Sequence, residues 1–317
     1  MAMGFYILSY LCIAVFALAT AYRIYRQFSL PVHVRWEIYP VQHEPAAKVA
    51  YGGSYMEEID WWEKKREQSL LSELRYMVPE ILFIRGLWKE NRCLWLVSFP
   101  FHFGLYLMIA TFVLLMVHAG FTLSGATVFA AGSALRTFLD GLIAIMGWMG
   151  LILGNIGSLG LLYKRWTDPE LRNYSSPIDY FNILFILIFF LSAFVSSLSG
   201  NPLLEDARAY TLGLMTGGRS PAPYMPGQSA AGVVAIVSAS LLAAYIPLTH
   251  MSHMFMKYFL YHNVKWDDAP NRPGSRIEAA ILENLGLKPT WAAKHIGADG
   301  QKSWRDIASS APKEEKK

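Results

Sequence analysis

The sequence has little charge and little cysteine, and it lacks the motifs that identify most nucleotide-dependent enzymes. Only 16% of its 317 residues are charged. The two cysteines, Cys12 and Cys93, show neither a metal-ligand spacing nor a disulfide framework. The chain contains no dinucleotide-binding fingerprint, no P-loop, no cysteine cluster and no internal repeat of roughly 20 to 50 residues. Any chemistry must therefore come from side chains within apolar segments, from a bound cofactor or from a partner.

What the sequence has in excess is apolar residues, which make up 54% of it and occur in five continuous runs. The runs cover residues 5–21, 94–118, 138–162, 178–199 and 230–254. A run of roughly 18 or more apolar residues can cross a hydrocarbon core of about 30 Å as a helix, which satisfies its own backbone hydrogen bonds. The sequence therefore predicts an all-α integral membrane bundle of about five transmembrane helices.

The first run is expected to be a retained helix and not a cleaved secretory signal. No Lys or Arg precedes Arg23, and the run continues into bulky residues where a signal would have a small-residue cleavage site. It therefore counts as the first of the five predicted spans.

A long loop, residues 26–93, separates the first two runs. From about Glu57 to Trp88, apolar residues recur at helical spacing among charged neighbours. This pattern predicts a helix that lies in the membrane interface or docks on a partner subunit. We expect a membrane domain at residues 1–265, with this loop included, followed by a polar tail at residues 266–317.

Cationic residues are distributed unevenly among the segments between the runs. Lys and Arg number 11 in residues 23–93, 3 in 163–177 and 11 after His250, against 1 in 119–140 and 2 in 200–229. Cationic loops stay in the cytoplasm, so we expect the N-terminus outside and the long loop and C-terminus inside, across the cytoplasmic membrane of a prokaryotic cell. The net charge of +4 follows from this asymmetry, and no nucleic-acid partner is expected.

Four of the eight histidines, His102, His118, His250 and His253, lie within or at the end of a predicted span. An imidazole in hydrocarbon is costly without a partner, so each is a candidate for a function. Two neutral imidazoles from facing helices are well suited to hold a haem iron between them.

The four histidines differ in their depth in the membrane and in the direction in which they leave the helix. His102 lies near the expected cytoplasmic start of the second span, and His250 and His253 lie at the cytoplasmic end of the fifth. His118 comes 16 residues after His102, which is about 24 Å further along a helix and about 160° around it. The sequence thus predicts one bis-histidine haem site near the cytoplasmic face, with His102 and either His253 or His250 as iron ligands.

Two short motifs resemble the respiratory nitrate reductase gamma-subunit superfamily of membrane cytochromes b. The stretch SFPFHFG at residues 98–104 is similar to the family's second-helix haem motif, and PLTHMSH at residues 247–253 is similar to the site of its second ligand. Matched residue by residue, His102 and His253 take the positions of the haem ligands, and His250 stands where those subunits have a basic residue.

The same resemblance shows a departure. Where nitrate reductase gamma subunits hold a second haem, this chain has Phe112 and Ala235 in place of the two histidine ligands. The outer haem pair of the family is therefore missing, and a second haem is expected only if the chain builds it differently, for example on His118.

Two further stretches, YGGSY at residues 51–55 and KYFLYHNVKWDD at 257–268, resemble membrane subunits related to heterodisulfide reductase. Members of that branch work with cytoplasmic iron–sulfur proteins, often in sulfate-reducing metabolism. The resemblance implies a haem b subunit that passes electrons between menaquinone or menaquinol and a cytoplasmic, heterodisulfide reductase-like iron–sulfur subunit. Further membrane or periplasmic cytochrome subunits would complete such an oxidoreductase complex, and the chain would not be catalytic alone.

Three residues near the expected outer face are candidates for cofactor binding: His118, Arg136 and Asp140. They suit contacts with a quinone oxygen, and His118 also suits quinol proton transfer or a second haem. The segment 200–228, rich in Gly, Pro, Ser and Met, shows no catalytic residue.

A transporter and a haem-free membrane anchor are the two alternative interpretations. A transporter is disfavoured because the chain has five spans, no inverted repeat and no charged residue deep within a span. A haem-free membrane anchor of a peripheral redox complex remains the alternative interpretation.

Overall fold

The computed structural model describes residues 2–29, 69–199, 203–219, 229–253, 255–256, 272–290 and 297–310, together with a few isolated residues between 47 and 63. Every regular element within these ranges is a helix. Five helices are long and apolar enough to cross a membrane: Met3–Ser29, Arg92–Ser124, Ala134–Thr167, Pro177–Ser199 and Ala230–Leu248. The all-α membrane bundle predicted from the apolar runs is therefore confirmed, and the protein is a multi-pass membrane protein.

The chain divides into two compact units. The first comprises Met1–Thr20 and Val78–Met251, and the second comprises Ala21–Met77 and Ser252–Lys317. The predicted domain boundary at residue 265 lies outside the described residues, so it stays a prediction.

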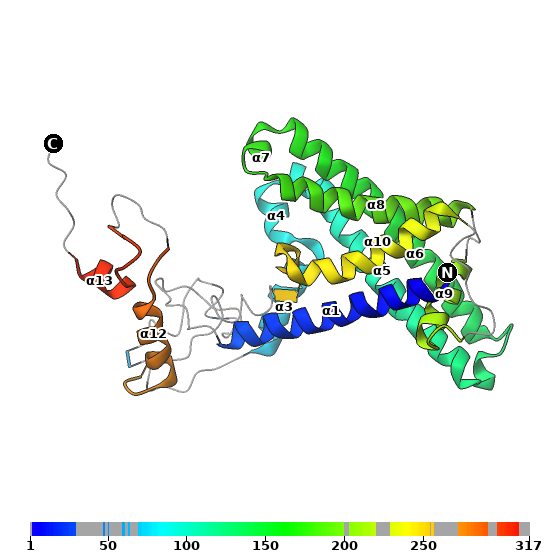
Figure 1. The fold of residues 1–317 in the computed structure, drawn as a ribbon, viewed down its shortest axis with the longest axis horizontal. Helices are drawn as coiled ribbons and strands as arrows, with labels where there is room; N and C mark the ends of the chain where they lie inside the picture. The colour runs from blue at the N-terminus through cyan, green and yellow to red at the C-terminus, as the bar shows by residue number, and fades with distance from the viewer. Residues whose placement is uncertain are drawn as a thin grey trace. The chain divides into compact units, whose positions relative to one another are not determined.

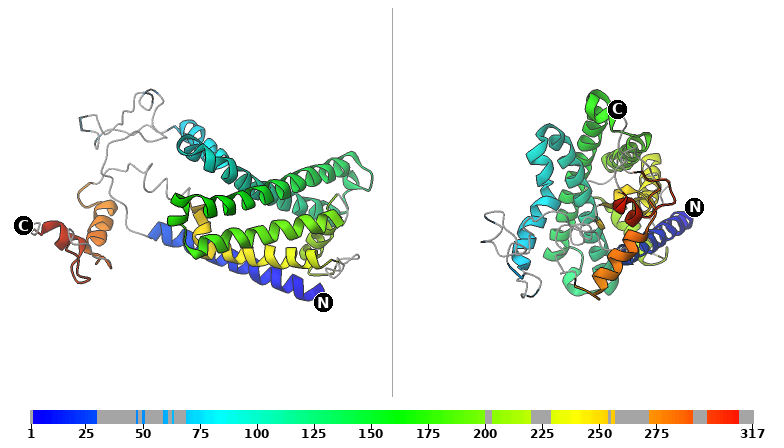
Figure 2. Two further views of the ribbon diagram at one scale, coloured as in Figure 1. Left: turned by 90° about the horizontal axis from the view of Figure 1, so that it is seen from above. Right: turned by 90° about the vertical axis from the view of Figure 1, so that its left-hand side faces the viewer.

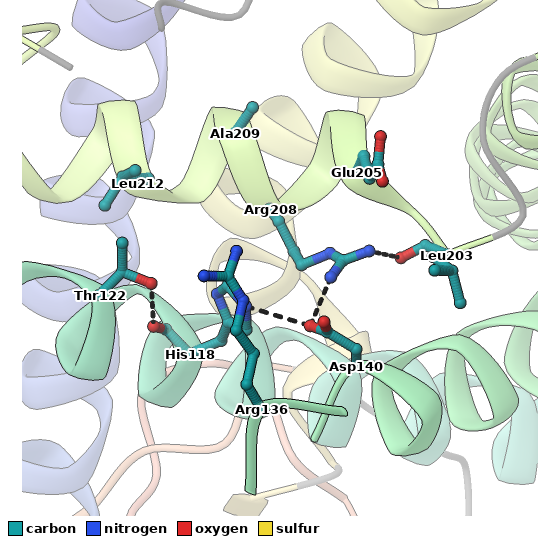
Figure 3. Close-up of a pocket in the computed structure, with 9 residues that line it drawn as sticks. All are labelled: His118, Thr122, Arg136, Asp140, Leu203, Glu205, Arg208, Ala209 and Leu212. Carbon is teal, nitrogen blue, oxygen red and sulfur yellow. Dashed lines mark hydrogen bonds and ion pairs between the residues drawn. The ribbon is translucent and has the colours of Figure 1, made fainter. Parts of the chain in front are cut away.

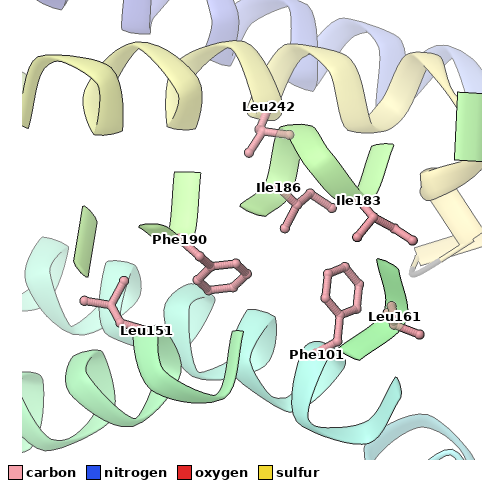
Figure 4. Packing of buried hydrophobic residues seen from close by; sticks show 7 residues of the cluster. All are labelled: Phe101, Leu151, Leu161, Ile183, Ile186, Phe190 and Leu242. Atoms are coloured by element: carbon pink, nitrogen blue, oxygen red, sulfur yellow. The ribbon is translucent and has the colours of Figure 1, made fainter. Parts of the chain in front are cut away.

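The first unit is built on a row of four long helices: α5 (Arg92–Ser124), α6 (Ala134–Thr167), α8 (Pro177–Ser199) and α10 (Ala230–Tyr245). In that row α5 packs on α6, α6 on α8 and α8 on α10, and the short α9 (Glu205–Met215) packs against α5 (Figures 1 and 2). The apolar core lies between these helices, around the fully buried Phe190 and the neighbouring Leu151 and Ile186 (Figure 4). Large apolar side chains such as Phe138 and Leu198 face outward, as lipid-exposed surfaces do.

Close backbone contact joins α5 to α6 around Gly157. A Cβ atom at this position would overlap the backbone and side chain of Phe101 on α5. Membrane helices gain little from burying apolar surface against each other, so they depend on such close van der Waals packing. This contact lies one residue from His102, so it fixes the part of α5 that carries the predicted haem ligand.

The N-terminal helix α1 (Ala2–Ser29) is attached to the first unit by its first turns. The Tyr6 ring stacks on Tyr210 of α9 with centroids 5.0 Å apart, and the Ser9 hydroxyl lies 2.7 Å from that of Ser240 on α10. Residues farther along α1, such as Leu18, are highly exposed. These contacts attach the first turns of α1 to α9 and α10, and the expectation that this helix is retained stays a prediction.

The fifth span differs from its prediction. The α-helix stops at Tyr245, and two 3₁₀ turns follow, η4 (Ile246–Leu248) and η5 (His250–Ser252). Pro247 explains the stop, because proline has no backbone N–H to continue the α-helical ladder. His250 and His253 therefore lie beyond the α-helix, where a uniform pitch of 100° per residue no longer gives their direction.

The loop between the first two spans contains α3 (Leu70–Phe83) and α4 (Arg85–Glu90). Most of residues 57–68 of the expected helix over 57–88 lie outside the described residues. The rest is broken in two at Ile84, which adopts a left-handed conformation with φ 51°. The position of this segment in the membrane interface or on a partner stays a prediction. The Glu80 carboxylate accepts a hydrogen bond from the Gly86 backbone at 2.9 Å and closes the corner. The C-terminal tail of the second unit contains two short helices, α12 (Arg276–Gly286) and α13 (Trp304–Ser309).

Candidate functional site

His102 is oriented by the backbone of its own helix. Its Nδ1 lies 2.8 Å from the carbonyl oxygen of Ser98, one turn earlier, and 3.3 Å from the Ser98 hydroxyl. A carbonyl can only accept, so Nδ1 carries the proton and the lone pair of the neutral ring is on Nε2. This is the arrangement found in metal-binding histidines, where a second hydrogen bond fixes the tautomer and the ring direction.

His250 is engaged by a polar cluster at the ends of α8 and α10. Its Nε2 lies 3.2 Å from the side-chain amide of Asn182, and the Tyr245 hydroxyl donates to the Asn182 amide oxygen at 2.8 Å. The Asp179 carboxylate is 3.6 Å from the same Nε2. Asn182 is buried with 4% exposure, so the cluster satisfies an amide that would otherwise be costly inside the bundle. The Nε2 lone pair of His250 is therefore used within the protein.

His253 lies in the second unit, and its side chain is exposed. Just before it, the buried Ser252 accepts a hydrogen bond at 3.0 Å from the guanidinium of Arg23 on α1. His102 belongs to the first unit, so the pairing of His102 with His253 stays a prediction.

The histidines predicted as ligands are of the residue type that haem b takes at its axial positions. His102 presents Nε2 as an acceptor, whereas His250 uses its Nε2 to bind Asn182. Of the two histidines near the end of the fifth span, His250 thus has its Nε2 in contact with Asn182, and the choice of His253 as the second axial ligand stays a prediction.

The second candidate site is a pocket at the opposite end of α5 from His102, which we call the Asp140 pocket (Figure 3). It has a volume of about 280 Å³. Residues from α5, α6, α9 and the segment just before α9 line it: His118, Thr122, Arg136, Asp140, Leu203, Glu205, Arg208, Ala209 and Leu212. The structure therefore brings together all three residues predicted near this face, His118, Arg136 and Asp140.

At the centre of the pocket, Asp140 lies between a histidine and an arginine. Its carboxylate is 3.1 Å from Nε2 of His118 and forms an ion pair with the Arg208 guanidinium. His118 is 7% exposed, yet its Nε2 makes no well-directed hydrogen bond to any residue that the structure describes, and the same holds for Nε of Arg208. The Nε of Arg208 is thus a buried donor that a ligand with oxygen atoms could use, while Nε2 of His118 faces the Asp140 carboxylate.

Arg208 was not found by sequence reasoning. The segment 200–228 suggested no functional residue, but it contains α9, which lies against α5 and turns Arg208 toward Asp140 (Figure 3). A second guanidinium nitrogen donates to the carbonyl of Leu203 at 2.6 Å and holds the side chain in place. A mixed-charge start, Glu205 and Asp206 before Arg208, was the only available signal, and it is common on solvated helices.

Arg136 lies beside the pocket over an aromatic ring. Its guanidinium carbon is 5.8 Å from the centroid of Phe129, whose ring also packs edge-on against His118 at 5.0 Å. Cation–π contact of this kind keeps the positive charge near the pocket without neutralising it. The pocket thus combines two guanidinium groups, two carboxylates and one imidazole.

Comparison with protein families matches the nitrate reductase gamma subunit over residues 87–267, which is more than half of the chain and includes α5, α6, α8 and α10. Searches of curated proteins and of solved structures returned no match. Both stretches that carry the resemblance to heterodisulfide reductase-related subunits lie outside the described residues, and that narrower assignment stays a prediction. The chain belongs to the nitrate reductase gamma subunit family, the membrane cytochrome b subunits of respiratory oxidoreductase complexes.

Proposed function

We propose that the protein binds one haem b near the cytoplasmic face, with His102 and His253 as axial ligands. The observation that carries the proposal is the bond from Nδ1 of His102 to the Ser98 carbonyl, within the helix that matches the family. When bound, the haem carries single electrons through the membrane, and the protein supplies its ligands, an apolar cage and its orientation.

The proposed electron partners are menaquinone or menaquinol on one side and a cytoplasmic iron–sulfur subunit, related to heterodisulfide reductase, on the other. The cationic loop and tail support a cytoplasmic docking face for that subunit. The whole assembly would act as a quinone-reactive oxidoreductase in the cytoplasmic membrane of a prokaryote, with the N-terminus outside.

The Asp140 pocket is the proposed site for the quinone headgroup. Quinone oxygens accept hydrogen bonds, and Arg208 and Arg136 can donate them. His118 beside Asp140 suits proton exchange, because a neighbouring carboxylate stabilises the protonated ring. The same carboxylate argues against His118 as an iron ligand.

About 24 Å of helix separates His118 from His102. The proposed quinone site and the proposed haem iron are therefore two separate sites on α5. A quinone analogue that binds near His102 and not in the Asp140 pocket would contradict this placement.

The experiment that tests the proposal is a pyridine haemochrome assay on the purified, detergent-solubilised protein. We expect a haem b spectrum, a reduced-minus-oxidised difference spectrum and about one haem per chain. A protein that incorporates no haem in a haem-sufficient host would establish the alternative, a haem-free membrane anchor.

A further inference from the structure

Helix α1 contributes a cation to the segment that carries His253. Arg23 is the first Lys or Arg of the chain. Its Nη1 donates to the hydroxyl of Ser252 at 3.0 Å, and Ser252 is 3% exposed. Both residues belong to the second unit, as does His253, which directly follows Ser252. Arg23 is therefore held at the residue next to the proposed iron ligand.

The hydroxyl of Ser252 accepts a hydrogen bond from only one of the N–H groups of Arg23. A guanidinium has five N–H donors and a full positive charge, whereas Ser252 offers one neutral acceptor. Arg23 is half-buried at the end of an apolar helix, and it forms no ion pair with any carboxylate among the described residues. A charge partly withdrawn from water is costly unless an anion accompanies it.

We propose that Arg23 pairs with a propionate of the haem whose iron His253 binds. This inference rests on the proposed function. Haem b carries two propionates that are ionised at neutral pH, and the planar fork of arginine matches a carboxylate in a bidentate arrangement. Because α1 lies outside the residues that match the family, 87–267, the family match assigns no role to Arg23.

The competing explanation is a membrane anchor. An arginine at the end of a transmembrane helix often extends its charged head toward the interface, which fixes the depth of the helix. Such an anchor would affect insertion or stability and would leave the redox properties of the haem unchanged. A cation beside a propionate acts differently, because it stabilises the reduced haem, which carries one more negative charge than the oxidised haem.

The test compares redox titrations of the full-length haem protein with R23Q and R26Q. Arg26 is a matched control, since it lies three residues further along α1 and is exposed. We expect R23Q to shift the haem midpoint potential to a more negative value, or to lower the haem content, while R26Q matches the wild type. Circular dichroism and gel filtration of each variant report folding separately.

A conservative pair covers the case in which R23Q does not fold. R23K keeps the positive charge but loses the planar guanidinium that can bind a carboxylate through two hydrogen bonds. We therefore expect a smaller negative shift of the haem midpoint potential for R23K than for R23Q, and no shift for R26K. Equal potentials and equal haem contents in R23K, R26K and wild type would overturn the inference, as would equal shifts in R23Q and R26Q. A wild-type protein without haem would overturn the proposed function itself, together with this inference.

Discussion

The two ends of α5 each carry one histidine, and the surroundings give the two side chains different properties. His102 is oriented by the backbone of its own helix, through Ser98. His118 faces a carboxylate from α6, which an arginine from α9 holds in turn. An imidazole fixed through Nδ1 presents Nε2 to a metal, whereas an imidazole beside a carboxylate is suited to exchange protons. The same residue type on one helix thus has two different surroundings.

The largest expected effect is on haem binding at the His102 end. We expect His102→Ala to abolish haem incorporation, because one of two axial ligands is lost. His118→Ala should retain the wild-type haem content, measured by pyridine haemochrome on purified protein. Loss of haem in both variants would contradict the distinction between the two ends of α5.

The next effect concerns packing near His102. Gly157→Ala should destabilise the bundle by about 1–3 kcal/mol, because the new methyl group overlaps Phe101 on α5. Gly141→Ala on the same helix is the control, since a Cβ atom there meets nothing within 4 Å. Thermal unfolding in detergent measures the difference, and equal melting temperatures would show that α5 and α6 do not need this close contact.

At the His118 end, the expected effect is on ligand binding. Arg208→Gln should weaken binding of a menaquinone analogue by roughly 10- to 100-fold, since a hydrogen bond to a charged group contributes about 1.5–3 kcal/mol. Arg219→Gln is the control, because Arg219 lies in the same loop and is exposed. Fluorescence-quench titration of the analogue gives both affinities. Unchanged binding in the Arg208 variant would remove the Asp140 pocket as the quinone site.

The smallest effect is expected where His250 meets Asn182. Asn182→Ala removes hydrogen-bonding partners of His250 and Tyr245, and a bond between membrane helices contributes about 0.6 kcal/mol on average. We expect a slightly lower melting temperature and an unchanged haem spectrum. An altered haem spectrum in this variant would indicate that the cluster acts on the haem, beyond its structural role.

The sequence was sufficient to predict the membrane-spanning helices but not the residues at which the helices end. Continuous apolar runs determine membrane spans because no other local structure satisfies the backbone in lipid. The stop of α10 at Tyr245 follows from Pro247, but the Asn182 cluster at the same end joins residues far apart in the chain and could not be predicted. The break of the loop helix at Ile84 likewise depends on a contact of Glu80 with Gly86.

The candidate sites, too, could be predicted from the sequence only in part. Spacing alone placed His118, Arg136 and Asp140 near one face, and the structure brings them into one pocket. Arg208 could not be predicted, because the ion pair with Asp140 joins two segments through the packing of α9 on α5. The preference for His253 over His250 came from the resemblance and stays a prediction, whereas the contact of His250 with Asn182 of another helix could not be predicted from the sequence.

The most direct test of the account is the haem content of His253→Ala beside that of His250→Ala. Both variants are purified in the same detergent and assayed by pyridine haemochrome and by reduced-minus-oxidised spectra. The account predicts that His253→Ala loses the haem and that His250→Ala keeps about one haem per chain. Full haem content in His253→Ala, with or without loss in His250→Ala, would contradict it.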